Sequence, residues 1–61
     1  MLRLVGYDAR LRVSEVEFNT GDKYQYKEVP VSEHEGLMSA ESLGKYMHRY
    51  IIHHYDYERL N

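Results

Sequence analysis

The sequence contains no cysteine and no tryptophan, and only one proline and four glycines among its 61 residues. Without cysteine, neither a disulfide nor a thiolate metal site can stabilise the fold. No apolar run approaches the length of about 18 residues needed to span a membrane, and there is no secretory leader. We therefore expect a soluble, intracellular, cytoplasmic protein without a membrane partner. The length allows one domain, over residues 1–61, with a narrow margin of stability.

Charge is distributed unevenly along the chain, although 8 Lys and Arg against 10 Asp and Glu give a net charge of only −2. That sum is not typical of a strongly basic nucleic-acid-binding domain. Residues 28–41 contain acidic side chains but no Lys or Arg, whereas residues 42–54 contain Lys45, Arg49 and three histidines but no acid. The pattern indicates either two helices of complementary charge or a local positive face.

The first half of the chain alternates with a period of two, which is typical of strands with one covered face. Alternation runs over residues 2–7, 13–18 and 23–27. Asp8 is suited to start the first turn, and Gly21 can adopt the positive φ of a tight second turn. The pattern predicts a three-stranded antiparallel meander, which is stable only if something apolar covers one side.

The second half has helical spacing. Ser32-Glu33-His34-Glu35 fits a capping box, and Gly36 should keep that helix short. Ser42 is a second start signal, and a helical stripe follows it: Leu43, Tyr46, Met47, Tyr50, Ile51 and His54. We predict an α+β domain of order β-β-β-α-α, with both helices on one face of the sheet. The tail, residues 55–60, should pack back as an extended segment.

Several short motifs occur together in this order: Gly6-Tyr7-Asp8, Glu15-Val16-Glu17-Phe18, Gly21, Tyr24-Gln25-Tyr26, Val29-Pro30, Ser42-x-Gly44-x-Tyr46, Ile51, Tyr55-x-Tyr57 and Leu60. The chain thereby resembles the KTSC domain, an appendage of some lysyl-tRNA synthetases that also occurs alone in bacteria and phages. The resemblance covers nearly the whole chain and implies an association with RNA. The chain departs from the family pattern at Ser14, where an apolar residue is usual, at Met47 for Phe, and at His48 for Asn.

Seven tyrosines stand out in so short a chain. Tyr24, Tyr26, Tyr46 and Tyr50 fall on the covered strand face or the helical stripe, so we expect them in the core or at its edge. Three others are less constrained, and we predict that they stack on a partner: Tyr7, Tyr55 and Tyr57.

The cationic side chains of the second helix are candidates for phosphate contacts. They are Lys45, His48, Arg49 and His53, with Lys23, Lys27 and Arg59 as further candidates. The alternative is a solvated helix face with cations near a helix C-terminus. The spacing of His48, His53 and His54 does not suit a shared metal ion, and no cysteine or well-spaced set of Asp and Glu residues completes a ligand set. We therefore predict no metal and no cofactor.

No nucleophile motif or phosphate-binding glycine loop is present, and a deep pocket is hard to form in so small a core. We therefore predict that the protein is not an enzyme. The first hypothesis is a non-catalytic RNA-binding or RNA-associated module. The alternative is a protein-interaction module, such as a bacterial or phage accessory protein that binds and modulates a larger partner. Association into a homo-oligomer is a further hypothesis.

Overall fold

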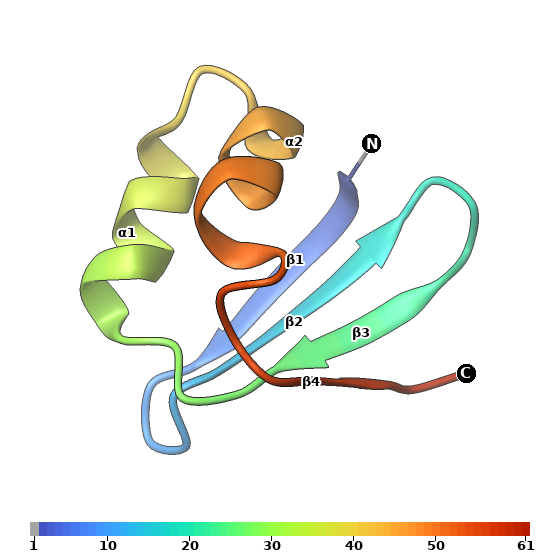
Figure 1. The fold of residues 1–61 in the computed structure, drawn as a ribbon, viewed down its shortest axis with the longest axis horizontal. Helices are drawn as coiled ribbons and strands as arrows, with labels where there is room; N and C mark the ends of the chain where they lie inside the picture. Colours follow the sequence, from blue (N-terminus) through green and yellow to red (C-terminus); the bar gives the residue numbers. More distant parts are fainter. Residues whose placement is uncertain (1) are drawn as a thin grey trace.

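The computed structural model describes residues 2–61 and consists of one antiparallel sheet with helices packed on one of its faces (Figure 1). The sheet has four strands in the order β1-β2-β3-β4. The predicted α+β architecture is confirmed, and the tail contributes an additional strand. The elements are β1 (Leu2–Asp8), β2 (Val13–Phe18), β3 (Lys23–Tyr26), α1 (Val31–Ser39), α2 (Leu43–Tyr46), η1 (Met47–Ile51) and β4 (Tyr57–Arg59).

Both predicted hairpin turns are confirmed. The Asp8 carboxylate accepts hydrogen bonds from the backbone N–H groups of Arg10 at 2.9 Å and Leu11 at 3.2 Å, which closes the turn between β1 and β2. In the second turn Gly21 has a φ of +93°, and its N–H donates to the Phe18 carbonyl at 2.9 Å. Each turn therefore uses the local chemistry that its sequence suggested.

The tail returns to the sheet and pairs with β3, which places Tyr57 opposite Tyr26 in the register. Backbone bonds extend this pairing beyond the strand ends, from Lys27 N–H to the Asp56 carbonyl at 2.8 Å and from Leu60 N–H to the Lys23 carbonyl at 2.8 Å. The predicted extended tail is thus a fourth strand.

Helix α1 begins two residues earlier than a capping box at Ser32 would require. Its N-cap is Pro30, with φ −67° and no side-chain cap, and the Pro30 carbonyl accepts the N–H of Glu33 at 3.0 Å. The fixed φ of proline positions that carbonyl, so Ser32 already lies within the first turn. The prediction that Ser32 caps the helix is therefore wrong.

The second helical segment starts as predicted but ends differently. The Ser42 hydroxyl accepts the N–H of Lys45 at 3.3 Å, and α2 then widens into the π-helical turn η1, where Ile52 N–H donates to the Met47 carbonyl at 2.7 Å. The wide turn keeps Met47 and Ile51 buried but leaves Tyr50 45% exposed. The predicted stripe is therefore wrong at Tyr50, and also at His54, which is exposed beyond the end of the helix.

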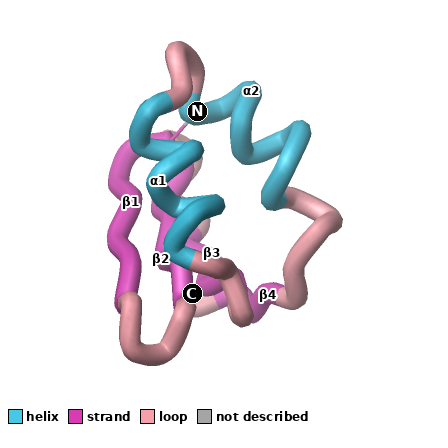
Figure 2. Tube along the Cα trace, turned by 90° about the vertical axis from the view of Figure 1, so that its left-hand side faces the viewer, coloured by secondary structure: helices cyan, strands magenta, loops and turns pink. Residues whose placement is uncertain are grey.

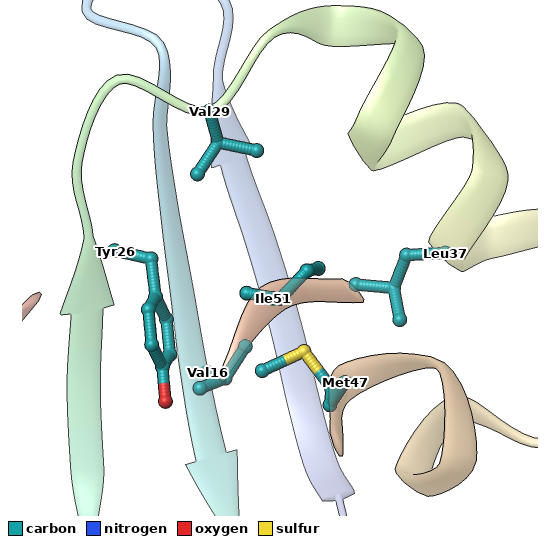
Figure 3. Packing of buried hydrophobic residues seen from close by; sticks show 6 residues of the cluster. All are labelled: Val16, Tyr26, Val29, Leu37, Met47 and Ile51. Atoms are coloured by element: carbon teal, nitrogen blue, oxygen red, sulfur yellow. The ribbon is translucent and has the colours of Figure 1, made fainter. Parts of the chain in front are cut away.

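All helices lie on the same side of the sheet (Figures 1 and 2). They enclose a small core of six apolar side chains, each no more than 4% exposed: Val16, Tyr26, Val29, Leu37, Met47 and Ile51 (Figure 3). Ser14 is also buried. Val16 of β2 and Tyr26 of β3 contribute the sheet side of the core, and Leu37 of α1 and Ile51 of η1 contribute the helix side. Burial of these side chains is what fixes the helices to the sheet.

Candidate nucleic-acid interface

Two adjoining hollows lie between the sheet and the second helical segment, and both are lined by Phe18 and His48. One has a volume of about 570 Å³ and the other about 390 Å³. We call the combined surface the helix-side groove. Its remaining side chains of interest are Lys45 and Arg49 in the larger hollow, and Tyr24, His53 and Tyr57 in the smaller one.

The floor of the helix-side groove is aromatic because three strands present rings on the face that the helices cover only in part. The ring centroid of Tyr24 lies 5.7 Å from that of Phe18 and 5.6 Å from that of Tyr57, each at an interplanar angle of 74°. Tyr57 is 57% exposed, whereas Tyr26 beside it is buried. Burial, together with the neighbouring phenols of Tyr24 and Tyr57, raises the pKa of Tyr26.

The rim of the groove is cationic. Ser42 starts α2 so that Lys45, His48 and Arg49 all face solvent on one side of the segment. Within residues 2–61 the ion pairs are Arg3 with Glu17 and Arg59 with Asp22, so the rim cations are not neutralised by a carboxylate there. The Arg49 guanidinium lies 5.6 Å from the ring centroid of Tyr50.

Of the acidic side chains that precede this rim, Glu33 is engaged away from the groove, whereas Glu41 lines a shallow hollow beside Lys45 and Arg49. The Glu33 carboxylate accepts hydrogen bonds from the hydroxyl of Tyr46 at 2.7 Å and from that of Tyr55 at 3.1 Å. The bond to Glu33, followed by burial, raises the pKa of Tyr46 to about 12. Burial, followed by the same carboxylate, raises the pKa of Tyr55. Because neither Lys45 nor Arg49 forms an ion pair within residues 2–61, the charge pattern agrees better with a local positive face than with two helices of complementary charge.

Two of the three tyrosines predicted to stack on a partner lie outside the groove. The Tyr7 hydroxyl donates to the Val29 carbonyl at 2.6 Å, and its ring stacks on His34 with centroids 4.4 Å apart. The Tyr55 hydroxyl is held by Glu33. Both rings therefore attach α1 to the rest of the fold and are more constrained than we expected, and their contact with a partner stays a prediction. Tyr57 is exposed within the groove, as predicted.

The predicted core tyrosines behave unequally. Tyr26 is buried, Tyr24 and Tyr46 are half-buried, and Tyr50 is exposed. Sequence reasoning did not assign Phe18 or Tyr24 to a binding surface. Their alternation with Val16 and Tyr26 was visible, but alternation does not show how far the short helices extend over the strands.

The histidines are separated by the end of η1. His48 and His53 both line the smaller hollow. Across residues 2–61, no group of three or more His, Cys, Asp or Glu side chains is arranged to hold a metal ion.

The helices within residues 2–61 include none with the length and hydrophobicity of a membrane-spanning helix.

The fold and the groove together define a small α+β domain with one partly open, aromatic and cationic face. Residues 1–55 match the family model of the KTSC domain, and the chain belongs to this family. KTSC is a family of small domains without a known catalytic role.

Known relatives include free-standing proteins and parts of larger ones. An uncharacterised protein of Stutzerimonas stutzeri is 38% identical over 61 residues, which cover 98% of this chain and 86% of that protein. The lysine–tRNA ligases of Trichormus variabilis and Nostoc sp. are each 34% identical over 55 residues. These cover 90% of this chain but 10% of each ligase. The crystal structure of a KTSC domain protein from Yersinia pestis superposes with a TM-score of 0.95 at 30% identity, covering 98% of this chain and 84% of that one.

Proposed function

We propose that this domain is a non-catalytic RNA-binding module, which holds unpaired bases in the helix-side groove. The observation that supports it best is that one exposed and two half-buried aromatic rings share a groove with cations that have no carboxylate partner within residues 2–61. Bases stack on aromatic side chains whatever their sequence, and phosphates attract Lys and Arg. The combination suits single-stranded RNA, whose bases are free to stack.

Each part of the groove has a separate task in this proposal. Tyr57, the most exposed ring, stacks on a base, supported from behind by Tyr24 and Phe18. Lys45 and Arg49 contact phosphates in the adjoining hollow. His48 and His53 line the smaller hollow together with Tyr57.

The net charge of −2 is compatible with this role because the acidic side chains are not concentrated at the groove. Asp22 lies at its edge, where Arg59 pairs with it at 2.7 Å. Few phosphates can be contacted at once, so we expect weak binding that depends steeply on salt. The similarity to a segment of two lysine–tRNA ligases supports an RNA-related role.

The proposal is tested by the fluorescence anisotropy of a labelled single-stranded RNA and of mixed tRNA, at about 50 mM and about 200 mM salt. We expect Lys45→Glu/Arg49→Glu to weaken binding at least tenfold and to reduce the salt slope by about 1.4, which corresponds to two phosphate contacts. Tyr57→Ala should weaken binding by about 5- to 100-fold through the loss of stacking, and Tyr57→Phe should bind normally.

The matched control is Arg10→Glu/Lys27→Glu, which makes the same change of charge at two exposed residues outside the groove. An equal loss of affinity in this control would mean that only overall charge matters. Absence of binding at the lower salt concentration would refute the proposal.

A further inference from the structure

The face of the sheet that is turned away from the helices contains a trough of about 370 Å³. We call it the outer trough. Its apolar sides are formed by Leu4 and Leu11, each 64% exposed, and by Val13. Isolated exposed leucines are ordinary, but these two line the same depression. None of the elements described within residues 2–61 covers this face.

Gly6 leaves the floor of the outer trough open, and no contact among residues 2–61 explains a glycine there. Gly21 is needed for its φ of +93°, and a Cβ at Gly36 would collide with the Tyr46 hydroxyl. A Cβ at Gly6 would meet nothing within 4 Å, and its φ lies outside the left-handed region. Glycine within a strand costs about 0.5–1 kcal/mol relative to alanine and often marks the close approach of a ligand or another backbone.

The sheet register determines the charge around this gap. Glu15 lies directly opposite Gly6, and the same row continues through Gln25 to Glu58. The neighbouring row places Glu17 opposite Leu4. The Arg3 guanidinium already lies 3.7 Å from the Glu17 carboxylate, which shows that a cation is accommodated beside these acids. Lys23 is the cation that lines the trough, and it lies opposite Glu17, so Glu15 is left beside Gly6 without an ion-pair partner within residues 2–61.

We propose that the outer trough is a docking site for a partner protein that lays a lysine or arginine side chain across Gly6. The aliphatic stem would pack against Leu4 and Leu11, and the cationic head would reach Glu15. Charge complementarity decides the class of occupant, because the acidic side chains repel a phosphate backbone and attract a basic segment. The partner segment is therefore amphipathic and basic, and it binds on the face opposite the helix-side groove.

The probe for this site is a synthetic 14-residue amphipathic peptide of leucine and lysine, and the matched peptide replaces lysine with glutamate. Two-dimensional NMR of the labelled protein locates binding. We expect the lysine peptide to shift the amide signals of Gly6, Glu15 and Gln25, while those of His48 and Tyr57 stay in place. The glutamate peptide should shift none of these signals.

Two variants test the geometry and the charge separately. Gly6→Val fills the trough at a site with free space, so it should fold normally and weaken peptide binding about tenfold or more. Glu15→Lys should weaken it by a similar factor. Glu35→Lys is the control, since it makes the same change of charge on the exposed surface of α1. RNA binding should be unaffected by Gly6→Val, which separates this inference from the proposed function.

Three results would each overturn the inference. The first is no binding of the lysine peptide, and the second is binding that Gly6→Val leaves unchanged or that shifts only the signals of the helix-side groove. The third is self-association in sedimentation experiments that Gly6→Val abolishes, which would assign the trough to a second copy of this chain.

Discussion

The two faces of the sheet are built from the same alternating strands, yet they differ in cover and in charge. The helix side contains every side chain of the apolar core, and beyond the helices it presents aromatic rings and cations. The outer face has no cover within residues 2–61 and presents leucines beside Glu15 and Glu17. The charged residues that line the outer trough are mostly acidic, whereas those that line the helix-side groove are mostly cationic. Composition alone therefore does not show which kinds of partner such a small domain can bind.

The largest expected effect on stability comes from comparing two leucine-to-alanine substitutions, one on each face of the sheet. Leu37→Ala removes a side chain with no exposed surface and should lower the free energy of unfolding by about 2–5 kcal/mol. Leu11→Ala, at 64% exposure on the outer face, should change it by no more than about 0.5 kcal/mol. Urea denaturation followed by circular dichroism measures both. Equal losses would show that the outer face also contributes to the core.

The second-largest effect on stability is expected at the hydrogen bonds between Glu33 of α1 and the hydroxyls of Tyr46 and Tyr55. Glu33→Gln removes the charge from the acceptor of both phenols and replaces one of the two accepting oxygens with an NH2 group that cannot accept, so we expect a loss of about 1–2 kcal/mol in unfolding free energy. A double-mutant cycle with Tyr46→Phe checks the assignment. Additive losses in that cycle would mean that the two side chains do not interact.

Alkaline pH should weaken the same network. The Tyr46 pKa rises from 10.0 to about 12 in the folded protein, so the folded state retains a proton that the unfolded chain loses. The stability contributed by this phenol is therefore complete below about pH 10 and is lost as the pH rises towards 12. Urea midpoints between these limits should fall, and Tyr46→Phe should make the fall shallower. A midpoint independent of pH would contradict the assignment.

A smaller effect is expected at Ser14, whose buried hydroxyl has no hydrogen-bond partner among the described residues. Ser14→Ala removes this unsatisfied group and should raise the unfolding free energy by about 1 kcal/mol. Ser32→Ala is the comparison, because Ser32 lies within α1 and does not cap it, so its replacement should be neutral to within about 0.5 kcal/mol. Thermal unfolding of both variants distinguishes these outcomes.

A small gain in stability is expected for Gly6→Val on the outer face. Because Gly6 has an ordinary φ and free space for a side chain, the substitution should stabilise the fold by about 0.4–1 kcal/mol. The measurement is the urea midpoint beside that of the wild type. A clear loss of stability would show that the strand needs glycine for its own geometry, and the argument for a partner at this position would fail.

Local chemistry explains what could be predicted from the sequence. The turns at Asp8 and Gly21, the Ser42 cap and the period-two strands all depend on interactions between residues close in the chain, and each is found in the structure. The basic residues of the second helical segment were also recognised in advance. In contrast, the site predicted from the sequence did not include the aromatic floor of the groove. Phe18 and Tyr24 come together with Tyr57 only when the tail pairs with β3, which is a contact between residues distant in sequence.

The order of the first three strands and the two helical segments, and the family, could be predicted from the sequence itself, since alternation and turn residues act over a few positions. Tertiary structure alone decided which tyrosines are free. Tyr7 and Tyr55 became attachments of α1, and the π-helical turn exposed Tyr50. The physical reason is that exposure depends on contacts between residues distant in sequence, and no local pattern reports where a short helix stops covering a sheet.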